Sequence, residues 1–144
     1  QKHPSSDQPA PKVTLLDLCF PNNEEFTVLG CGQNFMGEWR YNNGILKHKR
    51  YALDNNQDLS DIRANGIIFY SIIFIGDMAI TSGSDGYLYV WKEGTLAKRQ
   101  NAHPGHAVLS LYTAPNSKIF ASGGTNGRVV IWKIWSSLII QHQG

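Results

Sequence analysis

The sequence predicts an all-β chain of about three four-stranded antiparallel sheets, and the strongest observation behind this prediction is an internal repeat. The stretch GSDGYLYVWK at residues 83–92 aligns with GTNGRVVIWK at residues 124–133, at a constant offset of 41 residues. Each copy holds a glycine turn, an apolar strand and a closing tryptophan. A period of roughly 40 to 45 residues with this pattern is typical of the blades of a partial or complete β-propeller.

A second observation is that strand-like runs alternate with turn residues, four runs to a period, as in a propeller blade. In the first, partial blade (residues 13–53) the expected strands are 13–20, 26–31, 35–41 and 45–53. Asn42-Asn43-Gly44 favours a type I′ hairpin, because Asn and Gly accept the positive φ angles of that turn. The last strand contains Lys47, His48, Lys49 and Arg50, so we expect it at an outer edge, where lysines discourage pairing between sheets.

The second blade is expected at residues 66–102 and the third at residues 103–144. Their expected strands are 67–75, 78–82, 87–92 and 95–100, then 107–112, 118–122, 128–132 and one within 137–141. The first of these is an almost continuous apolar run, which is typical of a strand buried on both faces.

Trp39 aligns with Trp91 and Trp132, but the interval from Trp39 to Trp91 is the longer one. The surplus lies in the polar residues 54–65, which we expect to form a long loop between blades. Residues 1–12 are polar, contain three prolines and are expected to be a linker or an extended arm.

The length of 144 residues is too small for a closed propeller, which needs roughly 4 to 8 blades of about 40 residues. We therefore expect the chain to be part of a larger propeller, with the remaining blades of the same polypeptide as neighbours. An open fan of three blades would leave sheet faces uncovered.

Charge is distributed unevenly along the chain. The net charge of +2 is too small to indicate a nucleic-acid partner, but all 11 acidic residues lie at or before Glu93. Residues 94–144 contain five basic residues and no acidic ones, so this half could present a positive face to an acidic partner. The contact candidates are Lys98, Arg99, Lys118 and Arg128. The alternative is that these side chains only keep the surface solvated.

Cys19 and Cys31 lie in strand-like apolar contexts, which favours two buried, inert thiols over a disulfide. The expected compartment is therefore intracellular and reducing. No apolar run reaches the roughly 18 residues of a membrane span, so no membrane partner is expected.

The tryptophans and the residues near them show a resemblance to a known family. Each Trp closes the third strand of its blade, where burial between sheets is expected together with a partner for the indole N–H. The chain resembles the WD-repeat propellers, whose blades contain a Gly-His, a Ser or Thr, an Asp and a Trp that form a buried hydrogen-bond relay. The resemblance implies these blade-locking residues: Ser82 or Ser84, Asp85 and Trp91 in the second blade, His103 or His106, Ser122, Asn126 and Trp132 in the third, and Trp39 in the first. It is imperfect, since Asn126 replaces the usual Asp, no His precedes the second blade, and Lys follows Trp91 and Trp132 where Asp is usual.

The blades also resemble those of the echinoderm microtubule-associated-protein-like family. The residues that carry this resemblance are YVWK at 89–92, AHPG at 102–105, LYT at 111–113, SGG at 122–124 and VIW at 130–132. It implies a microtubule-associated scaffold that binds tubulin and other cytoskeletal or axonemal proteins. The implied location is the cytoplasm and cytoskeleton, including the axoneme of a cilium or flagellum. The alternative is a WD-repeat adaptor for another assembly, such as a ubiquitin ligase, a coat or a transport complex.

No enzyme, cofactor or metal site is expected. A triad of Ser82, Asp85 and His103 or His106 lacks a Gly-x-Ser-x-Gly elbow and an oxyanion hole. Ser and Asp three residues apart around a tight turn serve equally well as a capped hairpin. The histidines show no paired metal-ligand spacing.

Overall fold

The fold was analysed in a computed structural model, which describes residues 12–21, 26–53, 62, 65–135 and 138–142. The expected arm at residues 1–12 and most of the expected loop at residues 54–65 therefore lie outside the described residues. Within the described part of the chain, no helix has the length and apolar character needed to cross a membrane.

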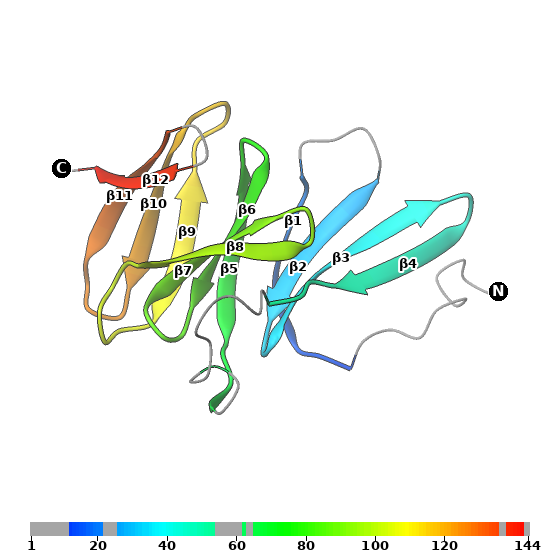
Figure 1. Cartoon of the computed structure of the whole chain (residues 1–144), viewed down its shortest axis with the longest axis horizontal. Helices are drawn as coiled ribbons and strands as arrows, with labels where there is room; N and C mark the ends of the chain where they lie inside the picture. Colours follow the sequence, from blue (N-terminus) through cyan, green and yellow to red (C-terminus); the bar gives the residue numbers. More distant parts are fainter. Residues whose placement is uncertain (1–11, 22–25, 54–61, 63–64, 136–137, 143–144) are drawn as a thin grey trace.

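Twelve strands in the described residues form three antiparallel four-stranded sheets (Figure 1). The first sheet has the order β1-β2-β3-β4, with β1 at Leu15–Cys19, β2 at Thr27–Gly32, β3 at Phe35–Asn42 and β4 at Ile45–Arg50. The second has the order β5-β6-β7-β8, with β5 at Phe69–Ile75, β6 at Met78–Gly83, β7 at Tyr87–Lys92 and β8 at Thr95–Asn101. The third contains β9 at Val108–Thr113, β10 at Ile119–Gly124, β11 at Val129–Trp135 and β12 at Leu138–His142. The predicted fold class, a partial β-propeller of three four-stranded blades, is confirmed.

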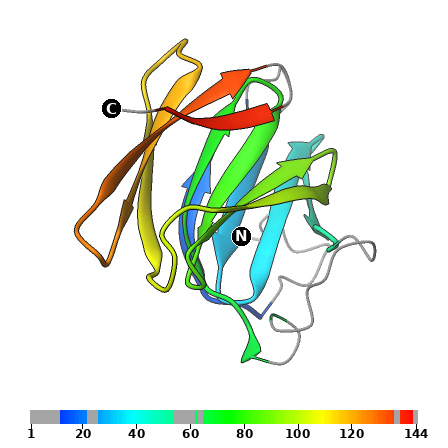
Figure 2. The same cartoon turned by 60° about the vertical axis from the view of Figure 1, so that its left-hand side comes forward.

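The sheets follow one another like the blades of an open fan, and Figure 2 shows them side by side from a second direction. One core fills the space between the first and second sheets and includes Leu29, Phe69 and Trp91. A second core between the second and third sheets includes Ile80, Val108 and Trp132. Each sheet thus covers the apolar face of the next, which is how stacked repeats bury a continuous core.

The turns follow from local sequence. Asn43 and Gly44 have φ angles of 51° and 80° and join β3 to β4, as the type I′ prediction requires. The apolar run around Ile72 forms β5, whose residues are buried or half-buried throughout. β4, with its four basic residues, lies at the edge of its sheet as predicted.

Each of the first two blades is tied to the following blade through the turn between its own second and third strands. In the first blade, the Asn34 N–H donates to the Ile67 carbonyl at 2.7 Å, and the Asn34 side-chain oxygen accepts the Ile67 N–H at 2.7 Å. In the second, the Gly86 carbonyl accepts the N–H groups of Ala102 and His103, both at 3.0 Å. A further link lies at the outer edge, where Ala52 exchanges backbone hydrogen bonds of 3.2 Å with Gly94 and Leu96.

The two end sheets keep one apolar face without a neighbouring sheet among the described residues. On the first sheet the exposed side chains include Leu18, Phe20, Phe26 and Tyr41. On the third they include Leu109, Tyr112, Ile119 and Val129. The fan is therefore open at both ends.

Candidate functional site

The third blade contains a complete chain of hydrogen bonds around His103. The Trp132 indole N–H donates to the Ser122 hydroxyl at 2.9 Å, and that hydroxyl lies 2.9 Å from Nε2 of His103. Nδ1 of His103 lies 3.1 Å from the Asn126 side-chain oxygen, which also accepts the Arg128 N–H at 3.2 Å. Because this oxygen is an acceptor, the ring proton resides on Nδ1, and Nε2 accepts from Ser122. Trp132, Ser122 and His103 are all buried, so the relay is internal.

His106 lies outside this relay. Its Nδ1 is 3.4 Å from the exposed Thr125 hydroxyl, while its carbonyl and that of His103 flank Gly86. Of the two histidines proposed from the sequence, the structure thus brings His103 together with Ser122 and Asn126. The side-chain partners of His103 are Asn126 and Ser122, so the described residues do not assemble the Ser-His-Asp arrangement considered above.

In the second blade the indole N–H of the tryptophan also donates to a hydroxyl, but no histidine takes part. The Trp91 indole N–H donates to the Thr81 hydroxyl at 2.9 Å, a partner that the sequence comparison missed. The predicted Ser82 instead accepts the Ser71 N–H at 3.1 Å. Thr81 could have been found by register, because it pairs with the residue two before the tryptophan, as Ser122 does in the third blade.

Asp85 is the centre of a polar cluster at the turn of the second blade. Its carboxylate accepts from the Tyr89 hydroxyl and, at 3.1 Å, from Arg99. The Arg99 guanidinium lies over the Tyr87 ring at 4.2 Å from its centroid and is mostly buried. Burial, followed by the bond to Asp85, raises the pKa of the Tyr89 phenol above its ordinary range. Arg99 thus binds Asp85 within the protein, although the sequence analysis placed it among the candidate partner contacts.

The first blade departs from this pattern. Trp39 occupies the place of Trp91 and Trp132, but it is half-buried because its face is the open one. Where the other blades have a hydroxyl, this blade has Gly30, at which a Cβ would lie 2.8 Å from the Trp39 ring. Trp39 packs on Phe35, with ring centroids 5.6 Å apart.

The remaining predicted contact residues do not form one patch. Lys118 and Arg128 are exposed and lie at opposite ends of the β10–β11 hairpin, roughly 20 Å apart along the strands. Lys98 is half-buried on β8, in the second sheet.

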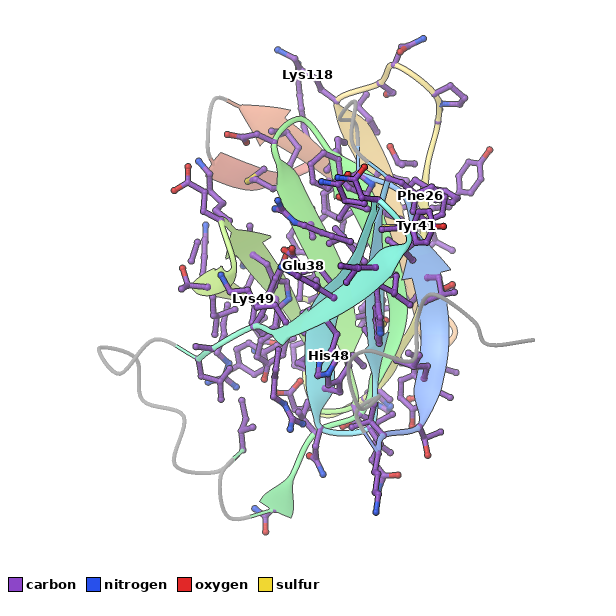
Figure 3. The ribbon with its side chains drawn as sticks, turned by 90° about the vertical axis from the view of Figure 1, so that its right-hand side faces the viewer. Phe26, Glu38, Tyr41, His48, Lys49 and Lys118 are labelled. Carbon is purple, nitrogen blue, oxygen red and sulfur yellow. The ribbon has the colours of Figure 1, made fainter. Side chains whose placement is uncertain are left out.

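A basic surface on the first blade was only partly foreseen from the sequence. Figure 3 shows the outward side of this blade, with Phe26 and Tyr41 next to each other and with His48 and Lys49 along β4. A hollow of about 580 Å³ lies against Phe26, Tyr41, Arg40 and Lys47. The run of basic residues in β4 indicated part of this surface. Tyr41 lies in β3 and Phe26 precedes β2, so the sequence alone could not assign these two side chains to it.

The described acidic side chains are largely engaged inside the protein. Asp17 accepts the Ile72 N–H at 2.9 Å, and Glu38 accepts from Arg40 and, at 2.7 Å, from the Tyr51 hydroxyl. Asp85 is held by Tyr89 and Arg99. The other two described acidic residues, Asp77 and Glu93, are exposed, and Asp77 lies 3.5 Å from Lys92. Exposed lysines such as Lys47, Lys49 and Lys118 therefore dominate the described surface more than the net charge indicates.

The two cysteines are free thiols on the inward face of the first sheet. Cys19 pairs with Leu29 and Cys31 with Asp17, so the cysteines are diagonal neighbours, roughly 7 to 8 Å apart and too distant for an unstrained disulfide. Burial, followed by the charge of Asp17, raises the pKa of Cys19 to about 12 and that of Cys31 further. Among the described residues, no group of three or more His, Cys, Asp or Glu side chains is arranged to hold a metal ion.

Comparison with known proteins agrees with this architecture. Residues 94–133 match the WD40 family model, described as "WD domain, G-beta repeat". No curated protein matches the chain.

Among solved structures, the computationally designed Ika4 protein has a TM-score of 0.57 at 17% identity, over 94% of this chain and 76% of that one. The designed Ika8 protein has a TM-score of 0.53 at 18% identity, over 90% of this chain and 36% of that one. The WD40 β-propeller domain of Doa1 has a TM-score of 0.42 at 12% identity, over 92% of this chain and 54% of that one. The chain thus spans about a third of the Ika8 structure and about half of the Doa1 one. The match to the WD40 family model thus falls on residues 94–133, within an unclosed β-propeller of three blades.

Proposed function

We propose that this chain is a non-enzymatic scaffold that docks onto microtubules, in the cytoplasm and on the cytoskeleton of a cell, including the ciliary axoneme. WD40 repeats in general build scaffolds for protein partners, which supports the first part. The observation that carries the second part is the charge distribution. Three of the described carboxylates are engaged internally, while Lys47, Lys49 and Lys118 are exposed. Tubulin surfaces and tails are acidic, so they complement such a surface.

The energetics require many contacts. Each exposed ion pair contributes only about 0 to 1 kcal/mol and is screened by salt. Lys118 and Arg128, at the two ends of one hairpin, would each meet a different part of the acidic lattice. Multiple weak contacts of this kind predict binding that falls steeply as ionic strength rises.

Co-sedimentation of the chain with taxol-stabilised microtubules over a salt series tests the proposal. We expect the bound fraction to fall as salt increases, and to fall at constant salt in the variant Lys118→Glu/Arg128→Glu. Lys98→Glu alone, a single reversal at a half-buried position, serves as a control of smaller effect. Binding that is indifferent to ionic strength would refute the electrostatic version, and absence of binding at low salt would refute the microtubule partner.

A second function, as an adaptor for another protein complex, is favoured by a different observation. A hollow of about 440 Å³ lies where turns of all three blades meet, against Phe20, Pro21, Phe74 and Pro115. None of the described residues that line it is charged, so it suits an uncharged peptide of an assembly partner. Phe20→Ala should weaken capture of such a partner while leaving microtubule co-sedimentation unchanged, and the reverse result would favour the first function.

A further inference from the structure

The outer strand of the first blade has a free edge and a groove beside it. β4 ends the strand order of its sheet, so within the described residues no strand pairs with its outer side. Lys47 and Lys49 alternate with His48 and Arg50 along it, and both lysines are exposed. An unpaired edge of this kind presents backbone N–H and C=O groups to an incoming segment.

Two hollows join along this strand. The first, of about 580 Å³, lies against Phe26, Tyr41, Arg40 and Lys47, and the second, of about 390 Å³, against Arg40, Lys47, His48 and Lys49. Because they share Arg40 and Lys47, they form one groove, called here the β4 groove. From Ile45 to Lys49 it runs for roughly 14 Å, the length of four or five extended residues.

One end of the β4 groove is aromatic. The rings of Phe20, Phe26 and Tyr41 form edge-to-face pairs with centroids 5.9 and 6.1 Å apart. These side chains are 68%, 55% and 43% exposed, although large apolar residues are normally buried. They therefore offer a ready contact surface for an apolar or aromatic side chain.

The rest of the groove is cationic. Its single described acidic residue, Glu38, is 8% exposed and accepts from Arg40 and Tyr51, so its charge is largely compensated. Lys47 and Lys49 project from one face of β4, the face of their partners Arg40 and Glu38, whereas Tyr41 projects from the opposite face. Alternate residues of an extended peptide likewise point to one side. A ligand with carboxylates at alternate positions matches this spacing.

We propose that the β4 groove binds an extended acidic peptide segment that places one apolar or aromatic side chain against Phe26 and Tyr41. The peptide adds to β4 as a fifth strand. Its carboxylates point to the face of Lys47 and Lys49, and its apolar side chain points to the opposite face, toward Tyr41, and fixes the register. The inference deepens the proposed function and rests on its acidic partner, because it assigns the partner's chemistry and its place on the fold.

A second copy of the chain fits this surface poorly. The complementary open face, on the third sheet, belongs to residues 94–144, which contain no acidic residue. It carries the exposed Lys118 and Arg128, so stacking it on the first blade would bring like charges together. Like-charge contacts suppress association with the wrong partner.

The test measures binding of a fluorescein-labelled synthetic peptide of alternating Glu and Gly with one central Phe, by fluorescence anisotropy on the whole chain. We expect Lys47→Glu/Lys49→Glu to weaken binding by about tenfold or more, since two favourable contacts become repulsive. Lys118→Glu/Arg128→Glu changes the net charge by the same amount on the third blade and should leave the Kd within about twofold. Phe26→Ala should weaken binding, Phe26→Leu should largely retain it, and a peptide with Ala in place of Phe should bind more weakly to the unmodified chain.

Equal weakening by the two double variants would overturn the proposal, because it would show that the peptide is attracted by the overall positive charge and not by the β4 groove. Absence of peptide binding by the unmodified chain would overturn it as well. So would a dimer, seen by sedimentation velocity, that Phe26→Ala dissociates, because the occupant would then be a second copy of the chain. Circular dichroism on each variant verifies that the fold is intact, and Lys47→Gln/Lys49→Gln provides a milder second variant. If the chain binds the peptide at the β4 groove but does not co-sediment with microtubules, the microtubule proposal fails and the groove stands. If the chain co-sediments with microtubules but does not bind the peptide, the groove proposal fails and the microtubule proposal stands.

Discussion

Three tryptophans occupy the same place in their sheets but have different surroundings. Trp91 and Trp132 are 2% and 1% exposed and donate to hydroxyl groups, whereas Trp39 lies half-buried on an open face beside Gly30. We expect Trp91→Ala and Trp132→Ala to cost about 3 to 5 kcal/mol of unfolding free energy. Trp39→Ala should cost about 1 to 2 kcal/mol, because less of its surface is buried. Urea denaturation followed by circular dichroism measures all three, and equal costs would contradict the open first face.

Asn126 occupies the position where related blades have Asp, and it accepts from the His103 ring and the Arg128 N–H. Asn126→Asp replaces a neutral acceptor with a charged one of the same shape. Hydrogen bonds to charged groups contribute more than neutral ones, so we expect the variant to be more stable by about 1 kcal/mol. Denaturant unfolding of the variant at neutral pH measures the change. A loss of stability would show that the relay does not use this oxygen as an acceptor.

The thiols give a prediction for pH. The pKa of Cys19 is raised from 9.0 to about 12, so the folded protein holds this proton where the unfolded chain releases it. Its contribution to stability is therefore complete below pH 9 and is lost as the pH rises toward 12. At pH 8 we expect a thiol-reactive reagent to label the native protein far more slowly than the urea-unfolded protein. Rapid native labelling that disappears in Cys19→Ala would contradict the buried setting.

At the scale of elements, the turns between strands differ in what they tolerate. Gly86 has a φ of 88°, and a Cβ there would lie 2.5 Å from the His103 carbonyl oxygen, whereas Gly105 has a φ of 76° with no atom within 4 Å. Gly105→Ala should therefore cost only the backbone penalty of about 1 to 2 kcal/mol. Gly86→Ala should cost about 3 kcal/mol or more, because it also displaces the segment that enters the third blade. Thermal unfolding of the two variants checks this, and similar losses would show that the contact is unimportant.

Most elements could be predicted because the repeat fixes them. The expected strand at residues 87–92 coincides with β7, and the positions of Gly83 and Gly124 placed the matching hairpins in two blades. The partners of individual side chains could not be predicted in the same way. The partner of Trp91 is an exception, because the 41-residue offset aligns Thr81 with Ser122. Arg99 is half-buried because it lies opposite Tyr89 on β7, which the repeat does not indicate. Such cross-strand neighbours depend on register, which a single sequence does not specify.

At the scale of the whole molecule, the two open faces are apolar at their centres and basic around them. Phe26 and Tyr41 lie at one end of the fan, Tyr112 and Val129 at the other, and lysines flank both. We expect the chain to be monomeric at low ionic strength and to self-associate increasingly as salt screens the repulsion and strengthens apolar contacts. Sedimentation velocity over a salt series measures this. A stable dimer at low salt that dissociates on adding salt would contradict the charge argument.

The backbone bonds between Ala52 and the start of β8 join the first two blades at their outer margin, while Asn34 and Ile67 join them at the turn ends. Because these two attachments lie at different distances from the inner strands, we expect them to restrict rotation of one blade against the other. Two proteins bound to the first and second blades would consequently be held at a nearly fixed distance and angle to each other.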